Sequence, residues 1–240
     1  MKASVLVGAP VSELHEYCFE EFIDAITSFS YDNYDILLVD NSKADDFFNK
    51  IKQKNIPVVK LDYLEKMRDR VTQSHNLLRK EALDKRYDCL LVLDQDIIPP
   101  KDVIQKLTSH KKPVVCGLYF GHHTIETGEN RIMPFAWKFK EEKRQGHWGA
   151  VRYINPDEVW NPQLLEIAFT GMGCVMISRE VLEKIKFRYD PSIDAWDDRW
   201  LGYDAWANGF KVYLDNTAKC RHLYMKRPFD YHKIKEEGLV

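Results

Sequence analysis

Short apolar runs alternate with longer amphipathic segments in the first half of this chain, from Ala3 to Tyr119. Such alternation predicts strands joined by helices, as in the βα units of a parallel sheet. Apolar residues recur at helical spacing after the first run, and the segment 65–85 is rich in helix formers. The five predicted strands are Ser4 to Gly8, Ile36 to Asp40, Pro57 to Leu61, Cys89 to Asp94 and Pro113 to Tyr119. The first half is therefore predicted to be an α/β layer of the nucleotide-binding type.

The second half differs in composition, because all six tryptophans lie after residue 136. Aromatic faces are good platforms for sugar rings, but most tryptophans belong to a core, so we expect one or two to contact a ligand. The segment from Gly121 to Arg131 is predicted to be a polar loop that can fold over a ligand, with His122 and His123 solvated rather than metal-bound. No Pro/Gly-rich linker separates the halves, so a single domain over residues 1–240 is predicted.

Overall charge excludes some partners. The 240 residues hold 35 basic and 37 acidic side chains, with no basic stretch dense enough to predict nucleic-acid binding. The mildly basic and aromatic segment from Lys219 to Lys235 leaves peripheral contact with an anionic membrane open. No apolar stretch approaches the roughly 20 residues of a membrane span, and Met1 to Pro10 is too short and too lightly charged for a signal peptide.

Cysteine usage indicates a reducing compartment. Five cysteines is an odd number, and Cys89, Cys116 and Cys174 lie inside apolar runs at spacings that suit neither a disulfide framework nor a zinc site. They are interpreted as small buried hydrophobic residues. Together with the missing span and signal peptide, this pattern predicts a cytoplasmic protein.

The most informative chemical feature is the pair Asp94 and Asp96 at the end of an apolar run. Alternate residues of an extended segment point the same way, so both carboxylates can converge on one cation while Gln95 faces away. Hard oxygen ligands suit Mg2+ or Mn2+, and Mg2+ is usually held by one or two carboxylates plus substrate phosphates. The alternative is that Asp96 caps a helix opening after Pro99 and Pro100 while Asp94 is merely exposed. From this segment alone the two interpretations are about equally good.

Polar residues also follow other predicted strands. In open α/β sheets ligands bind outside the carboxyl ends of the strands, where this chain places Ala9, Pro10, Asp40 and the segment 94–96. Asp40 is placed to accept hydrogen bonds from a base or a ribose. Turn and helix-cap chemistry is the alternative for the segment 40–42.

A second acidic pair, Asp197 and Asp198, precedes a predicted helix that ends at Asn208 and Gly209, where Gly suits the left-handed position. Asp197 can be the N-cap of that helix. Two adjacent carboxylates beside aromatic residues can also form a general base, since burial and a like charge both raise a carboxyl pKa. His222 follows a further predicted strand and has a chemical role only if the fold returns it to Asp94 and Asp96.

In their order along the chain, these motifs resemble those of GT-A fold glycosyltransferases, similar to the large inverting family two. The resemblance extends from about Val5 to His222 and rests on motifs that are each weak alone. They are Ala9-Pro10, Val39-Asp40-Asn41-Ser42, Asp94-Gln95-Asp96 with the following Ile97-Ile98-Pro99-Pro100, Pro113 to Tyr119, Gly171-Met172-Gly173-Cys174, Asp197-Asp198 and His222.

The resemblance implies an α/β fold with a mostly parallel central sheet and helices on both faces. It implies a nucleotide-sugar-binding half at 1–119, an acceptor-binding half at 120–215 and a segment at 216–240 that closes on the metal site. The implied ligands are a UDP- or GDP-sugar donor, Mn2+ or Mg2+, and a glycan, lipid, protein or small-molecule acceptor.

The resemblance also implies roles for individual residues. The donor would lie against Ala9, Pro10, Asp40 and the 94–96 segment with Gln95, and further contacts are implied for Arg70 and Asn76. Asp96 and His222 would hold the metal, and Asp94 would contact the ribose or the metal. Gly171, Met172 and Gly173 would line the acceptor side. Asp198, or alternatively Asp197, would be the base that deprotonates the acceptor hydroxyl.

This chain departs from the family pattern at two places. Ser74-His75-Asn76 keeps only the Asn of the usual Arg-Asn pair, and Asp197 stands where the family usually has Glu. Three alternatives stay open: a retaining GT-A transferase, a phosphohydrolase of the haloacid dehalogenase type, and a non-catalytic module that binds sugar nucleotides.

Overall fold

An eight-stranded mixed sheet forms the centre of the protein, in a computed structural model that describes residues 2–124, 128, 130–140 and 151–223. From one edge to the other its strands are β11 (Leu164–Ile167), β14 (Val212–Lys219), β6 (Val114–Leu118), β13 (Cys174–Ser178), β4 (Cys89–Leu93), β1 (Val5–Val11), β2 (Tyr34–Asp40) and β3 (Val58–Lys60). All five strands predicted in the first half are present, within a few residues of the predicted bounds.

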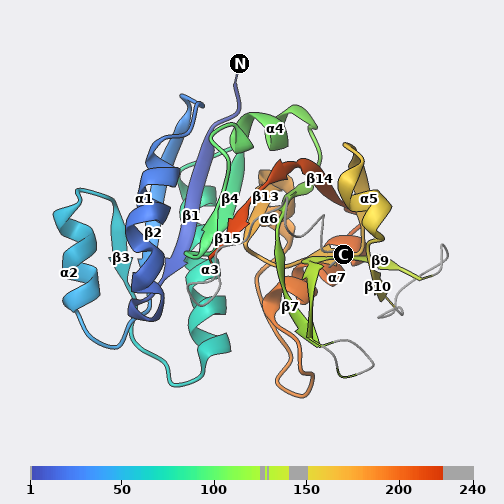
Figure 1. Cartoon of the computed structure of the whole chain (residues 1–240). Helices are drawn as coiled ribbons and strands as arrows, with labels where there is room; N and C mark the ends of the chain where they lie inside the picture. Colours follow the sequence, from blue (N-terminus) through green and yellow to red (C-terminus); the bar gives the residue numbers. More distant parts are fainter. Residues whose placement is uncertain (1, 125–127, 129, 141–150, 224–240) are drawn as a thin grey trace.

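The four strands β3, β2, β1 and β4 pair in parallel, as the βα pattern predicts. Next to them β13 is antiparallel to both β4 and β6, β14 is parallel to β6, and β11 is antiparallel to β14. The sheet therefore runs without a break from the first half of the chain into the second. Figure 1 shows β3 with α2 at one side of the molecule and α5 with β9 and β10 at the other.

Helices cover both faces of this sheet, as predicted. Successive strand residues point to opposite faces, so Leu90 and Val92 join one hydrophobic cluster while Leu91 and Leu93 join the other. The first cluster contains residues of α3 (Met67–Asp84), α6 (Arg179–Lys184) and α7 (Asp197–Ala207). The second contains residues of α1 (Phe19–Thr27), α2 (Asp46–Gln53) and α4 (Val103–Ser109). The sheet is therefore packed between two hydrophobic cores.

Smaller elements complete the described part of the chain. They are the 3-10 helix η1 (Glu13–Cys18), α5 (Pro156–Trp160), β5 (Ile97–Ile98) paired with β15 (Arg221–His222), the hairpin of β7 (Phe120–Thr124) and β8 (Asn130–Pro134), and a sheet of β10 (Val151–Tyr153), β9 (Ala136–Phe139) and β12 (Phe169–Thr170). The pairing of β15 with β5 closes the chain back onto the segment that follows β4.

The prediction of a polar loop from Gly121 to Arg131 is wrong, because most of this segment belongs to the β7–β8 hairpin. Residues 125–127 and 129 lie outside the described residues. His123 is half-buried rather than fully solvated. Its ring centre lies 4.4 Å from that of Phe135 and 5.7 Å from that of Trp137, and burial lowers the pKa of His123 to about 4. Aromatic packing across the hairpin, which sequence spacing does not reveal, accounts for the difference.

Two capping interpretations are also wrong. Helix α4 begins at Val103 with Asp102 in the cap position, so Asp96 does not cap it. Helix α7 has Trp196 at its N-cap, and Asp197 is its first residue. The end of α7 matches the prediction: Asn208 is the C-cap, and Gly209 follows with φ +78°.

Cysteine burial agrees with the sequence interpretation. All five cysteines are free; four are buried and Cys89 is half-buried. Among the described residues, no helix combines the length and apolarity that crossing a membrane requires. Most of the basic and aromatic segment from Lys219 to Lys235, and of the proposed closing segment 216–240, lies outside the described residues.

Candidate active site

A cleft of about 300 Å³ opens at the carboxyl ends of β1 and β4, where the strand order reverses. The chain runs from β1 outward to β2 and β3 and then returns to β4 on the other side of β1, which leaves a crevice between the loops that follow β1 and β4. The loop after β1 starts at Ser12, and the loop after β4 holds Asp94 to Asp96. The strand order alone thus places the acidic motif at the ligand-binding edge.

Nine of the residues singled out in the sequence line this cleft. They are Pro10, Arg70, Asp94, Gln95, Asp96, Met172, Asp197, Asp198 and His222. Three distant segments of the chain therefore meet at one place: the acidic loop after β4, the start of α7 and the short strand β15.

Asp96 and His222 form the first part of the site. Strand β15 pairs with β5 in a register that sets His222 opposite Ile97, and His222 Nε2 lies 3.2 Å from Asp96 Oδ2. His222 Nδ1 lies 2.6 Å from the carbonyl oxygen of Phe120 and donates to it. Because Nδ1 donates to a carbonyl, Nε2 is the nitrogen that faces Asp96. A metal-binding histidine usually donates from its other ring nitrogen in this way. The fold therefore returns His222 to the acidic motif, which is the condition for its having a chemical role.

The surroundings shift the pKa values of the two carboxyl groups of the motif in opposite directions. Burial, followed by the charge of Asp96, raises the pKa of Asp94 to about 6. Burial would also raise the pKa of Asp96, but the hydrogen bond and charge of His222 outweigh it and lower that pKa below its ordinary value. His15 adds to this effect, since its Nε2 lies 3.9 Å from Asp96 Oδ2.

Gln95 does not face the same way as its two neighbours. Its side-chain oxygen accepts from the backbone N–H of Ser12 at 2.8 Å, and its amide nitrogen donates to the carbonyl of His15 at 3.0 Å. Gln95 therefore ties the loop after β1 to the loop after β4.

The fit of a divalent cation can be judged from these side chains. Among the described residues, no group of three or more His, Cys, Asp or Glu side chains is arranged so that it could hold a metal ion. Asp94, Asp96 and His222 nevertheless lie on one wall of the cleft, and the charges of Asp94 and His222 act on each other. Two carboxylates and one imidazole suit Mn2+ or Mg2+ when ligand phosphates supply the remaining oxygens. The donor set fits such a cation in the presence of a diphosphate.

The second acidic pair divides into two different environments. Asp197 is only 3 % exposed, and its Oδ2 lies 2.6 Å from Nδ1 of His75. Asp198 is half-buried and accepts from the backbone N–H of Arg199 at 2.5 Å. Burial, followed by the charge of Asp197, raises the pKa of Asp198 to about 7. Asp198 is therefore the carboxyl group of the pair with a pKa suited to proton transfer near neutral pH.

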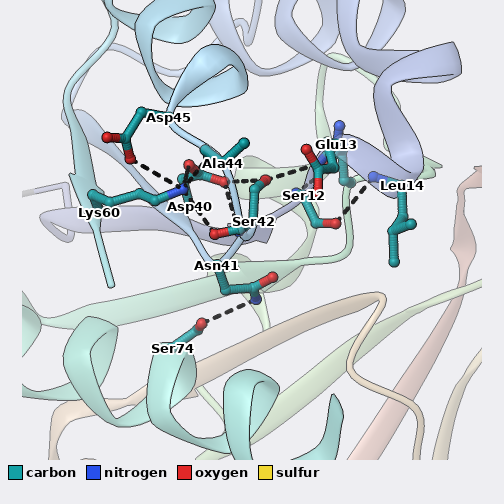
Figure 2. Close-up of polar contacts among 11 residues, drawn as sticks. Ser12, Glu13, Leu14, Asp40, Asn41, Ser42, Ala44, Asp45, Lys60 and Ser74 are labelled. Atoms are coloured by element: carbon teal, nitrogen blue, oxygen red, sulfur yellow. Dashed lines mark hydrogen bonds and ion pairs between the residues drawn. The ribbon is translucent and has the colours of Figure 1, made fainter. Parts of the chain in front are cut away.

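Other residues named in the sequence lie behind the cleft wall. Asp40 is fully buried; its Oδ1 accepts from the backbone and hydroxyl of Ser42, and its Oδ2 accepts from Lys60 at 2.8 Å (Figure 2). These are the turn contacts of the alternative interpretation, and Asn41 is the residue of this segment that lines the cleft. Ala9, 1 % exposed, is also absent from the lining.

Asn76 and the two glycines are engaged with the protein itself. The amide of Asn76 donates to the carbonyl of Phe187 at 2.8 Å and accepts from its N–H at 3.1 Å, which fastens α3 to the segment before α7. A Cβ at Gly171 or Gly173 would meet the ring or hydroxyl of Tyr119 at under 3 Å. Close backbone approach is thus required, as expected of glycine, but toward Tyr119, which itself lines the cleft.

Arg70 both contacts the protein around it and lines the cleft. Its Nη1 donates to the carbonyls of Leu64 and Glu65, and its guanidinium lies 4.6 Å from the ring centre of Tyr63. It also lines the cleft. Arg70 thus fixes the loop before α3 at the cleft rim.

The cleft residues to which the sequence assigned no role include His15, His75 and Tyr119. For His75 a signal existed, because Met67, Arg70, Val71 and His75 recur at helical spacing and all line the cleft. His15 and Tyr119 carry no such signal, since their places depend on how η1 and the end of β6 pack.

Comparison with known proteins supports the fold. No family model matches this chain, and no curated protein matches it in sequence. Solved structures do match: GalNAc-T7 with UDP, GalNAc and Mn2+ at 16% identity and TM-score 0.62, and the mannosyltransferase PcManGT of Pyrobaculum calidifontis with GDP-Man and Mn2+ at 13% and 0.61. A third is S. aureus TarS with UDP-GlcNAc, at 13% identity and TM-score 0.56.

These matches cover 92%, 100% and 90% of this chain, but only 43%, 62% and 57% of the respective structures. The chain therefore spans about half of the length of these proteins. At such identities the likeness establishes the fold: the protein has the GT-A glycosyltransferase fold, as the sequence motifs predict.

Proposed function

We propose that this protein is a metal-dependent glycosyltransferase that moves a sugar from a nucleotide-sugar donor to an acceptor hydroxyl, with inversion as in family two. The observation that supports this proposal most strongly is that a single cleft of the GT-A fold brings two sets of side chains together. One set is Asp94, Asp96 and His222, and the other is Asp198, whose raised pKa suits a base. The similar structures were solved with UDP, GDP-Man or UDP-GlcNAc, two of them with Mn2+.

The donor nucleotide is proposed to lie along the ends of β1 and β2. Pro10 and Asn41 line the cleft there, and the register of the two strands sets Val11 level with Asp40. Asp40 acts from behind, because its bonds to Ser42 and Lys60 hold the turn that presents Asn41 (Figure 2). Asn41 is itself fixed by donation to the hydroxyl of Ser74 at 3.3 Å.

Asp94, Asp96 and His222 are proposed to hold the cation that lies against the donor diphosphate. The cation, when bound, neutralises charge that develops on the departing nucleoside diphosphate. His222 is oriented for this role by its donation to Phe120. Gln95 contributes by joining the loops that follow β1 and β4, so that the carboxylates stay at the cleft edge.

Asp198 is proposed to be the base. It takes the proton of the acceptor hydroxyl, whose oxygen attacks the anomeric carbon of the donor sugar. The bond from that carbon to the diphosphate oxygen breaks, and the nucleoside diphosphate leaves with the electron pair. Asp197 is less suited to this task, because it is buried and bonded to His75. Of the two carboxyl groups that the sequence leaves open for the role of base, Asp198 is therefore the better candidate.

The acceptor is proposed to enter past Trp196. Among the described tryptophans, Trp196 alone lines the cleft, and it is 38% exposed beside Asp197 and Asp198. Leu14 and Met67, also exposed, line the cleft as well. Such a surface suits the apolar face of a sugar ring.

Calorimetry of UDP and GDP, with and without Mn2+, tests the proposal. We expect one of them to bind only when Mn2+ is present. The variant Asp96→Ala should lose this binding, whereas Asp102→Ala, which removes a surface carboxylate outside the cleft, should keep it. If neither nucleotide binds in a metal-dependent way, the proposal is wrong.

Hydrolysis of a panel of sugar nucleotides by the purified protein then identifies the donor. Turnover separates the transferase from a non-catalytic module, and release of a nucleoside diphosphate separates it from a phosphohydrolase, which releases inorganic phosphate. The anomeric configuration of the product distinguishes inverting from retaining transfer.

A further inference from the structure

His75 occupies an unusual position in the cleft wall. It lies on α3, its side chain is fully buried, and it is nevertheless among the lining residues. Its Nδ1 lies 2.6 Å from Oδ2 of Asp197 on α7, and its ring centre lies 5.1 Å from that of Phe187. Because a carboxylate accepts, Nδ1 carries the hydrogen of this bond. The ring is therefore held on one side by charge and on its face by an aromatic neighbour.

The opposite ring nitrogen of His75, Nε2, is buried and has no hydrogen-bond partner among the described residues. A buried polar atom without a partner is unfavourable, so most such atoms in native proteins are paired. Since Nδ1 is committed to Asp197, Nε2 is the atom of this ring that remains for a ligand in the cleft.

The position of His75 along the cleft indicates which part of a ligand it can meet. The charges of both Asp94 and Asp198 act on the His75 ring. Asp94 belongs to the diphosphate end of the proposed site and Asp198 to the acceptor end. The sugar that is transferred must lie between the leaving oxygen and the attacking oxygen, and so between these two carboxylates.

A hydroxyl group suits Nε2 better than a phosphate does. A hydroxyl both donates and accepts, so it can pair with Nε2 whether or not that nitrogen carries a hydrogen. A phosphate oxygen only accepts, so it can pair with Nε2 only when that nitrogen carries a hydrogen.

We propose that Nε2 of His75 hydrogen-bonds a hydroxyl group of the sugar being transferred, and that Asp197 holds the ring in place for this contact. The inference rests on the proposed function and gives Asp197 a positioning role distinct from the base. It makes His75 a determinant of which sugar the protein accepts.

Two variants distinguish the contributions of the two ring nitrogens of His75. In His75→Asn the shorter amide can still donate to Asp197 in place of Nδ1, but nothing replaces Nε2. In His75→Gln the longer amide can reach the position of Nε2. For each protein, calorimetry with Mn2+ measures the affinity for the nucleotide sugar and for the matching nucleoside diphosphate, which lacks the sugar.

We expect His75→Asn to bind the nucleotide sugar about tenfold more weakly, as for one lost hydrogen bond, while its affinity for the nucleoside diphosphate stays within about twofold. His75→Gln should recover part of the loss. Equal losses for both ligands, or no loss for the nucleotide sugar, would overturn the inference. Failure of the unaltered protein to bind either nucleoside diphosphate would instead refute the proposed function.

A further measurement does not depend on how well the variants fold. In the unaltered protein labelled with 15N, the Nε2 resonance of His75 should shift on addition of the nucleotide sugar by more than on addition of the nucleoside diphosphate. Identical shifts with the two ligands would contradict a contact to the sugar.

Discussion

The variant Asp198→Asn should stabilise the protein while it strongly lowers turnover. Burial and the charge of Asp197 raise the pKa of Asp198 from its ordinary 3.8 to about 7. Between these values the folded chain keeps a proton that the unfolded chain has lost, so the stability of the unaltered protein falls as pH rises through this window. Asn carries no charge at any of these pH values, and its oxygen can still accept from the N–H of Arg199.

The magnitude follows from the size of the pKa shift. Three pKa units at about 1.4 kcal/mol each set an upper bound near 4 kcal/mol for the free energy gained above pH 7. Because Asp198 is half-buried and water at the cleft mouth screens part of its charge, we expect a gain of about 1–3 kcal/mol. For a chain of this size, each kcal/mol raises the melting temperature by about 2–4 °C.

The assay is thermal unfolding of both proteins in metal-free buffer at pH 5 and pH 8.5, and turnover of the donor is measured separately with Mn2+ present. The stability difference at pH 5 should be about a third of its value at pH 8.5, because pH 5 lies about a third of the way from 3.8 to 7, and turnover should fall about 10²–10⁴-fold. A variant that is less stable at pH 8.5, or a difference that does not change with pH, would refute the reasoning.

Asp204→Asn is the matched control, because Asp204 lies on the same helix α7 and outside the cleft. Its carboxylate accepts from Arg188 at 2.7 and 2.8 Å. Removing this ion pair should cost about 0–1 kcal/mol and leave turnover unchanged.

Three other expectations concern the same cleft. The kcat/KM of the unaltered protein should rise with pH through about 7 as Asp198 ionises, and a flat rate profile between pH 5 and 8 would argue against this base. His222→Ala should weaken Mn2+ binding in the presence of the nucleoside diphosphate about tenfold or more, measured by calorimetry; unchanged affinity would remove His222 from the metal site. Trp196→Ala should raise the KM of the acceptor about tenfold and leave nucleoside diphosphate affinity unaltered, whereas an equal loss of both would place Trp196 at the donor.

Local pattern was enough to predict most of the sheet. Strands such as β4 are short apolar runs whose every second residue faces one helix layer, so the hydrophobic alternation reflects the burial directly. The position of the acidic motif could also be predicted, because it directly follows the apolar run of β4 and parallel strands expose their carboxyl ends at one edge of the sheet. Gly209 at the end of α7 was predictable because a left-handed position favours glycine over other residues.

The β7–β8 hairpin shows where local pattern fails. Its residues are polar enough to predict a loop, but His123 packs against Phe135 and Trp137, which lie on or beside other strands. Burial of this kind depends on which surfaces meet, and no spacing within the segment encodes that meeting.

By itself the sequence determined the α/β layer, the acidic loop and the identity of the carboxylates, because these depend on periodicity and on residues adjacent in the chain. Only the tertiary structure decided what each carboxylate contacts. It returned His222 to Asp96 through the pairing of β15 with β5, and it bonded Asp197 to His75 of α3, 122 residues away. The physical reason is that a pKa and a free hydrogen-bonding atom depend on burial and on partners, and both are properties of the packed chain.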